Sequence, residues 1–288
     1  MRVGRRAPLG NEAAVAVLFL APALIALVLF RIVPTGYAVV ESVRLKGEFV
    51  GLDNYRFLLD SDSFRRSLTT TLVFGAVLNP AQIGLALALA VLLIQRLPGA
   101  RLWRTLVFLP VAVPLLVSAL VWGIAFRPDD GIFNAVLAVV GVAKQPFLTS
   151  PDQALPSIML LASWAGVGYW MIFLIAGLQD IPPEYAEAAA VDGAGWWRTF
   201  RQITLPLLRR PLAFVLVADT VANFLLFAPV QVLTRGGPRE ATNLLMFEVY
   251  RQAYTFGDLA LASAEVVVVV VVMVAVVFVQ FRLLRSDG

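Results

Sequence analysis

Long apolar stretches restrict the fold of this chain more than any other feature of the sequence. A helix needs roughly 20 mostly apolar residues to cross about 30 Å of hydrocarbon. Six stretches meet that requirement, at about residues 13–30, 68–94, 106–126, 155–178, 212–233 and 259–281. The overall composition agrees, because 60% of the residues are hydrophobic and only 15% are charged, which is far outside the range of soluble domains. The sequence therefore predicts an all-α integral membrane protein with six transmembrane helices.

The first apolar stretch allows an alternative interpretation as a cleaved signal peptide, because it follows a basic cluster of Arg2, Arg5 and Arg6. No small-residue cleavage site followed by a soluble domain is present, and five further apolar stretches follow. We therefore expect the first stretch to remain as a membrane anchor. No repeat, linker or low-complexity segment divides the sequence, so residues 1–288 are predicted to form a single transmembrane domain.

Short connecting segments carry the charges that predict orientation. Residues 95–103 include Arg96 and Arg101, and the C-terminus carries Arg282 and Arg285. With the N-terminal arginines, these place both termini in the cytoplasm by the positive-inside rule. The longer loops on the other side of the membrane also contain basic residues. The predicted orientation therefore depends on the short segments. No basic run of the kind that follows nucleic acid occurs, and we expect no nucleic-acid partner.

The absence of two residue types excludes most catalytic chemistry. The chain contains no cysteine and no histidine. Thiolate and imidazole metal sites, disulfides and histidine-dependent nucleophiles are therefore excluded as features of this chain. No metal site and no enzymatic activity are expected.

Residues 179–211 differ from the other connections because they are long and patterned as two short helices. Pro182 and Pro183 suit the start of the first helix, and Glu184 and Glu187 place negative charge near its positive end. Gly193 supplies the left-handed residue that ends a helix. The second helix carries an apolar face formed by Trp196, Phe200 and Ile203. The sequence predicts that this helix ends at Pro206. A small-residue helix with a charged anchor is suited to docking against another protein.

At this segment the sequence resembles a known family. The segment is similar to the EAA loop of binding-protein-dependent ABC importer permeases. The matching positions are Glu187-Ala188-Ala189, then Gly193 after three residues, then Ile203-Thr204-Leu205-Pro206 after nine more. Residues 19–23, 49–55 and 232–238 resemble the MalF/UgpA-type subunit of carbohydrate-type importers. Arg235 departs from that pattern, where the family commonly has a glycine, and we expect only a local effect on the loop.

The resemblance implies an ABC importer type I permease fold in a bacterial cell membrane, with the EAA coupling helices in the cytoplasm. It also implies three partners besides membrane lipid: a second permease subunit of the MalG/UgpE type, a dimer of ATPase subunits, and an extracytoplasmic solute-binding protein. ATP and Mg would be bound by the ATPase subunits, because this chain has no P-loop sequence. By residue match, the ATPase-docking residues are Glu184, Glu187, Ala188, Ala189, Asp192 and Gly193.

The implied solute is a sugar or a related polar molecule, such as glycerol 3-phosphate or a glycerophosphodiester. The arginines cluster at the ends of the predicted spans, which favours a neutral sugar. A stand-alone secondary transporter or channel is the alternative, but it should show ionisable residues deep in several spans, and Asp219 is the one clear candidate. A membrane-embedded enzyme is less compatible still, because no span contains a pair of carboxylates.

Polar and aromatic residues inside the predicted spans are candidates for the translocation path. Intramembrane polar groups usually face a cavity or a partner helix, and aromatic rings stack on sugar faces. The candidates are Trp164, Tyr169, Asp219, Asn223 and Phe224. The alternative for each is a packing role, with Asn223 bonded to a neighbouring helix. Asn79-Pro80 is expected to mark a kink with Asn79 capping freed backbone groups, and Glu265 is expected near the outer end of the last span, within reach of water.

Overall fold

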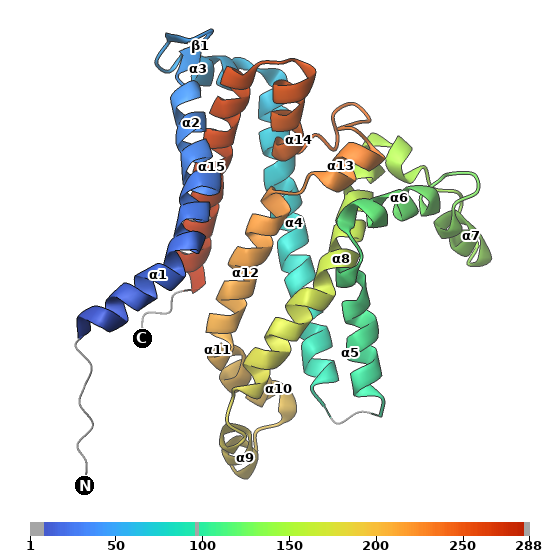
Figure 1. Cartoon of the computed structure of the whole chain (residues 1–288). Helices are drawn as coiled ribbons and strands as arrows, with labels where there is room; N and C mark the ends of the chain where they lie inside the picture. The colour runs from blue at the N-terminus through green and yellow to red at the C-terminus, as the bar shows by residue number, and fades with distance from the viewer. Residues whose placement is uncertain (1–8, 96–97, 285–288) are drawn as a thin grey trace.

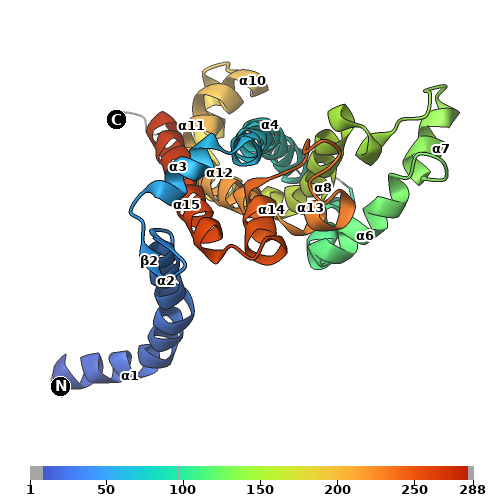
Figure 2. The ribbon, with the colours of Figure 1, turned by 90° about the horizontal axis from the view of Figure 1, so that it is seen from above.

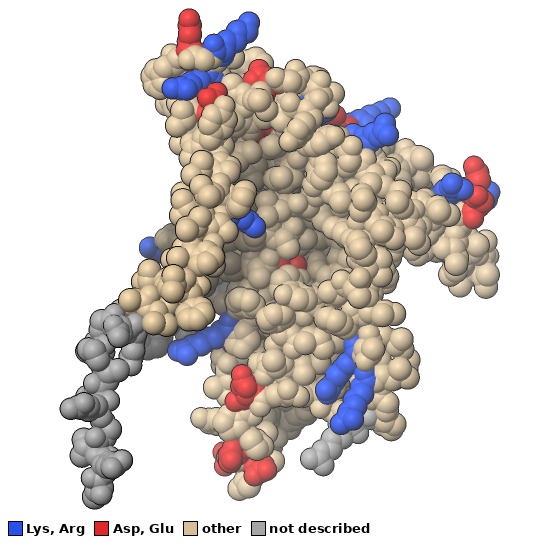
Figure 3. All heavy atoms as spheres, viewed as in Figure 1, with Lys and Arg blue, Asp and Glu red and all other residues tan. Residues whose placement is uncertain are grey.

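The computed structural model of the protein describes residues 9–95 and 98–284, and the described chain is mostly helical (Figure 1). Five helices are long and apolar enough to cross a membrane, and a bent pair of helices makes a sixth candidate. The chain is therefore a multi-pass membrane protein. Figure 3 shows that most charged side chains on the visible face lie toward its two ends.

The first helical rod is longer than the sequence predicts. It consists of α1 (Leu9–Leu27), the π-helical turn η1 (Val28–Ile32) and α2 (Val33–Glu41). The apolar stretch therefore continues to Glu41 instead of ending at Phe30, and Arg31 lies inside the rod. Pro34 explains the wide turn, because it has no N–H to bond to the carbonyl of Phe30. Figures 1 and 2 show the rod at one flank, where α2 runs along α15.

A hairpin and a short helix follow the first rod. Strands β1 (Arg44–Leu45) and β2 (Glu48–Phe49) pair antiparallel. Lys46 and Gly47 between them have φ of 52° and 86°, as a tight two-residue hairpin turn requires. Helix α3 (Asp53–Asp60) then leads into the bundle.

Four long helices form the central bundle: α4 (Asp62–Leu93), α8 (Pro151–Gln179), α12 (Arg209–Phe224) and α15 (Leu259–Leu284). Small residues bring their backbones close, as is usual in membrane bundles. A Cβ atom on Gly168 of α8 would lie 2.1 Å from the carbonyl oxygen of Val107, so only glycine fits there. The core between α4, α8 and α12 is apolar and buried, and it includes Ile83, Ala86, Val167, Met171, Leu174 and Val215.

The third predicted span is not a straight helix. Helix α5 (Ala100–Phe108) continues through the 3-10 turn η2 (Leu109–Ala112), and α6 (Leu115–Ala125) then departs at an angle of 99°. Pro110 and Pro114 flank the bend, and neither can donate the backbone hydrogen bond that a continuous helix needs. The span predicted over residues 106–126 is therefore bent within its length. Helix α7 (Ile132–Val139) and turn η3 (Phe147–Thr149) connect α6 to α8.

The fifth predicted span is interrupted. Helix α12 ends at Phe224, and α13 (Ala228–Leu233) begins after a short break that precedes Pro229. Helix α14 (Leu245–Tyr250) and the π-helical turn η5 (Arg251–Thr255) then pack beside α15. At the opposite end of the bundle, α8 and α12 are joined by α9 (Glu184–Val191), α10 (Trp196–Thr199), η4 (Phe200–Thr204) and α11 (Leu205–Leu207). Helix α15 ends toward the same end of the molecule as α9 (Figure 1).

Candidate functional site

The most prominent candidate site is α9, which projects beyond the bundle (Figure 1). Pro183 precedes its first residue, and Glu184 and Glu187 lie in its first turn, where the positive helix end favours negative charge. At the other end, Ala194 N–H donates to the Ala189 carbonyl at 2.8 Å, and Gly193 N–H donates to the Ala190 carbonyl at 3.1 Å. This is the Schellman arrangement, and it requires the φ of +75° that Gly193 adopts.

The predicted docking residues differ in exposure. Glu184, Glu187, Ala188, Asp192 and Gly193 are exposed, whereas Ala189 is only 6% exposed. Among the described residues, no cation lies within ion-pair distance of Glu184, Glu187 or Asp192, and Figure 3 shows acidic atoms gathered at this end of the molecule. Helix α9 therefore presents uncompensated negative charge on a small-residue surface, while Ala189 packs inward.

Exposed apolar side chains enlarge this surface beyond the predicted motif. Val191 at the end of α9 is 88% exposed, and Trp196 and Trp197 are more than half exposed. Trp196 stacks on Phe200 with ring centroids 5.4 Å apart and planes inclined by 4°. These rings and the end of α4 line an apolar groove of about 430 Å³. The sequence analysis assigned Val191 no role, although a valine two residues before the terminal glycine of an alanine-rich helix was an available signal. Pro206 does not end the second helix, because α11 continues to Leu207.

A second candidate site is a hydrogen-bonded polar cluster inside the bundle. Asn79 Nδ2 donates to Thr220 Oγ1 at 2.8 Å, and Asn79 Oδ1 accepts from Asn223 Nδ2 at 2.7 Å. Gln280 Nε2 also donates to Thr220 Oγ1, at 2.7 Å. Three helices, α4, α12 and α15, are thereby joined. The expectation that the Asn79 side chain caps backbone groups was wrong, because it bonds to two residues of α12. Helix α4 is continuous past Pro80.

Asp219 occupies the neighbouring turn of α12 and bonds to α8. Its Oδ1 accepts a hydrogen bond from Trp170 Nε1 at 2.7 Å, while Oδ2 has no partner among the described residues. Asp219, Asn223 and Phe224 are 1%, 6% and 2% exposed. The structure therefore places these three predicted path residues in the interior of the chain.

The two remaining path candidates lie on α8 and are partly exposed. Trp164 and Tyr169 are 39% and 40% exposed. Trp164 packs against Trp122 of α6 at 5.4 Å between ring centroids, and Tyr169 packs against Trp170 and Phe173 at 4.8 and 4.9 Å. The five predicted path residues do not form one surface, since Trp164 contacts α6 while Asp219, Asn223 and Phe224 face the interior.

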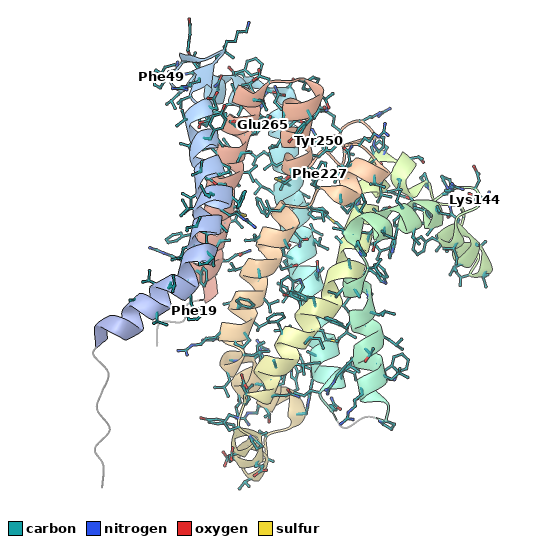
Figure 4. All side chains as sticks on the ribbon, viewed as in Figure 1. Phe19, Phe49, Lys144, Phe227, Tyr250 and Glu265 are labelled. Atoms are coloured by element: carbon teal, nitrogen blue, oxygen red, sulfur yellow. The ribbon has the colours of Figure 1, made fainter. Side chains whose placement is uncertain are left out.

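An aromatic groove at the break between α12 and α13 was not predicted. Phe227 and Tyr250 are neighbours (Figure 4), with ring centroids 4.9 Å apart. The ring of Tyr254 lies 5.1 Å from that of Tyr250. They line a cavity of about 330 Å³ between α14, η5 and α15. The i, i+4 spacing of Tyr250 and Tyr254 was the available sequence signal.

Glu265 is not within reach of water, contrary to expectation. It lies on α15 near its start (Figure 4) and is 1% exposed. Nearby, Arg251 forms ion pairs with Glu248 at 2.6 Å and with Glu240 at 3.4 Å, and Asn243 Nδ2 donates to Glu248 at 2.7 Å. These contacts hold the loop between α13 and α14 to α14 and η5.

Comparison with known proteins gives consistent results. Residues 81–286 match the family described as "Binding-protein-dependent transport system inner membrane component". The chain is 34% identical over 274 residues to the sn-glycerol-3-phosphate transport system permease protein UgpA of Yersinia pseudotuberculosis, covering 93% of both chains. It is 33% identical over 276 residues to UgpA of Agrobacterium fabrum, covering 93% of this chain and 94% of the relative.

Solved structures share the fold. A chain from the crystal structure of a bacterial ABC transporter involved in the import of the acidic polysaccharide alginate superposes with a TM-score of 0.84 at 22% identity, covering 96% of each chain. A second structure, of a bacterial alginate ABC transporter in complex with an alginate pentasaccharide-bound periplasmic protein, gives a TM-score of 0.85 at 22% identity, covering 96% of this chain and 95% of that chain.

Proposed function

Because the chain belongs to the family of binding-protein-dependent transport system inner membrane components and is a permease subunit of an ABC importer, we propose that α9 is the element through which an ATPase subunit docks. The observation that carries this proposal is a projecting helix with three exposed carboxylates that have no described internal partner and a rigid Schellman end. Glu184, Glu187 and Asp192 would anchor the contact, Ala188 would allow close approach, and Gly193 would fix the turn.

The proposed assembly contains this chain, a second permease subunit of the MalG/UgpE type, two ATPase subunits and an extracytoplasmic solute-binding protein. ATP and Mg would be bound by the ATPase subunits, and this chain would itself catalyse nothing. Docking of a cytoplasmic ATPase at α9 requires that end of the bundle to face the cytoplasm. Since α1 begins and α15 ends toward the same end of the molecule as α9 (Figure 1), both termini are proposed to be cytoplasmic.

The proposed cargo is a sugar or a related polar solute. The relatives named above are glycerol 3-phosphate permeases, and the structural neighbours serve the import of an acidic polysaccharide, so these comparisons do not favour a neutral sugar in particular. Trp164 and Tyr169, which keep exposed rings on α8, are the path candidates available to touch the solute. Asp219, Asn223 and Phe224 would shape the path from behind, by holding α12 against α4 and α8.

Replacement of Glu187 by alanine tests the docking proposal. Loss of a charged hydrogen bond at the contact is expected to weaken docking by roughly 1.5–3 kcal/mol, which is about tenfold or more in affinity. Uptake by proteoliposomes should fall accordingly while membrane insertion is unchanged, and Gly193→Asp should behave in the same way. Glu48→Ala, at an exposed acid on the hairpin at the opposite end, is the matched control. Normal uptake and hydrolysis in Glu187→Ala would refute docking at α9.

A further inference from the structure

An apolar groove lies between the last turns of α4 and the aromatic residues of α10 and η4. Its floor is a stripe of exposed residues one helical turn apart on α4, namely Gly84, Ala88 and Leu92. The floor is open because two of these residues are small, and a Cβ atom on Gly84 would meet no neighbouring atom within 4 Å. The groove has a volume of about 430 Å³, which leaves room for a flexible apolar chain.

Aromatic rings form the wall of the groove opposite α4. Trp196, Trp197 and Phe200 line it, and the rings of Trp197 and Phe200 have centroids 5.8 Å apart. The two tryptophans nevertheless remain 61% and 63% exposed. Exposed tryptophans beside a spanning helix are typical of the level where hydrocarbon meets the lipid headgroups, because indole has an apolar body and one polar N–H. The rings therefore mark the edge of the bilayer.

The position of the groove along α4 places its floor inside the bilayer. Helix α4 is long and apolar enough to span a membrane, and residues 83–94 contain no polar side chain. From Gly84 to Leu93, the last residue of α4, the helix rises about 14 Å. A water-soluble subunit that docks at α9 would not reach Gly84, because this length of apolar helix separates the two. The occupant of the groove is therefore a component of the membrane.

Two arginines adjoin the aromatic wall. Arg198 follows Trp197 and Arg201 follows Phe200 in the same helical segment, and both side chains are exposed. Among residues 9–95 and 98–284, neither arginine lies within ion-pair distance of a carboxylate, those of α9 included. Arg198 Nε donates only to the neutral Gln202 Oε1, at 3.2 Å. Uncompensated arginines beside an apolar groove at the end of spanning helices suit an anionic lipid headgroup.

We propose that this groove holds an acyl chain of an anionic phospholipid, whose phosphate is bound by Arg198 and Arg201. An apolar helix of another subunit would fill the groove but would bring no charge to the arginines. A zwitterionic lipid would fill it without net charge, so an anionic phospholipid satisfies both features. Figure 2 shows α10 beside α4 at the edge of the molecule, on the side away from α1. The proposal does not depend on docking of an ATPase at α9.

Quenching of tryptophan fluorescence by brominated lipid tests the proposal. The full chain is reconstituted in phosphatidylcholine vesicles that contain a small fraction of phosphatidylglycerol with brominated acyl chains. Subtraction of the Trp196→Phe/Trp197→Phe signal isolates these two tryptophans from the others among the six in the chain. Brominated phosphatidylglycerol should quench them with an apparent affinity roughly tenfold or more above that of brominated phosphatidylcholine, since each arginine near an anionic lipid contributes about fivefold. Equal quenching by the two lipids would overturn the proposal.

Charge variants separate a bound lipid from bulk lipid. Arg198→Gln/Arg201→Gln should abolish the preference for phosphatidylglycerol, because the phosphate loses both of its cations. Arg209→Gln/Arg210→Gln is the matched control, since it removes two exposed arginines at the start of α12, farther along the chain from the rings of the groove. This control should keep the preference. A preference that survives in Arg198→Gln/Arg201→Gln would contradict binding of the phosphate by these residues.

A groove-filling variant tests whether the acyl chain occupies the floor. Gly84→Leu should fold, because no neighbouring atom lies within 4 Å of its Cβ position, and its side chain should exclude the lipid and lower the quenching. Gly36→Leu on α2 is the matched control, since Gly36 also has no neighbouring atom within that distance. Undiminished quenching in Gly84→Leu would overturn the proposal. Loss of quenching when the wild-type chain is reconstituted as the assembled importer would also overturn it, and would show that a protein subunit covers the groove.

Discussion

The central bundle and the first rod both carry polar residues among apolar ones, but these residues differ in whether they have partners within the chain. In the bundle, Asn79, Thr220, Asn223 and Gln280 bond one another, and Trp170 bonds Asp219. In the rod, Arg31 has no described partner, and the apolar residues around it are uncovered. A buried polar group with an internal partner holds the chain's own helices together, whereas Arg31 is exposed and has no such partner among the described residues.

Glycine replacement should give the largest contrast between the two regions. Gly168→Leu forces a side chain into the backbone of Val107, where even a Cβ would lie 2.1 Å from the carbonyl oxygen. Overpacking of this kind is expected to cost about 3 kcal/mol or more. A Cβ on Gly36 of α2 would meet no neighbouring atom within 4 Å, so Gly36→Leu should be neutral or slightly stabilising through helix propensity. Thermal unfolding of the purified chain in detergent measures both, and equal destabilisation would contradict the contrast.

Removal of Asn79 should give an intermediate effect. Asn79→Leu deprives Asn223 Nδ2 of its acceptor and removes one of the donors to Thr220 Oγ1. The expected loss is about 1–2 kcal/mol, the range for interhelical hydrogen bonds in membranes. Asn223→Leu alone should cost a similar amount, and the double variant should cost less than the sum, because the two residues share one bond. Strict additivity would mean that the bond contributes no stability.

Replacement of Asp219 by asparagine should change stability less than the glycine and Asn79 replacements. Asp219→Asn keeps an Oδ1 acceptor for Trp170 Nε1, so the unfolding free energy should stay within about 0.5 kcal/mol of the wild type. Trp170→Phe removes the donor and should cost about 1 kcal/mol or more. Larger destabilisation by Asp219→Asn than by Trp170→Phe would show that Asp219 acts through something other than this hydrogen bond.

The sequence predicted the helical membrane class and the family because those depend on apolar runs and on a locally spaced motif. Apolar length does not report bends, so the 99° turn between α5 and α6 was missed although Pro110 and Pro114 were visible. The predicted first span ends at Phe30, whereas the helical rod continues through Arg31 to Glu41.

Among the site residues, too, the sequence predicted features set by neighbouring residues but not contacts between residues far apart in the chain. The helix at 184–191 and its glycine end follow from neighbouring residues, and the structure has both. The surroundings of Asp219, Asn223 and Phe224 depend on residues far away in the sequence, namely Asn79 and Trp170. Polarity inside a span could therefore indicate a special position but could not distinguish a solute path from an interhelical bond.

Single-cysteine cross-linking at adjacent alanines of α9 tests most directly whether this helix docks on the ATPase. The two positions are adjacent in the sequence, but Ala188 is exposed at the surface and Ala189 is buried, with 6% exposure. In the assembled complex, Ala188→Cys should cross-link to the ATPase subunit, and Ala189→Cys should not. Absence of a cross-link at Ala188, with the ATPase still bound to the complex, would contradict docking through α9.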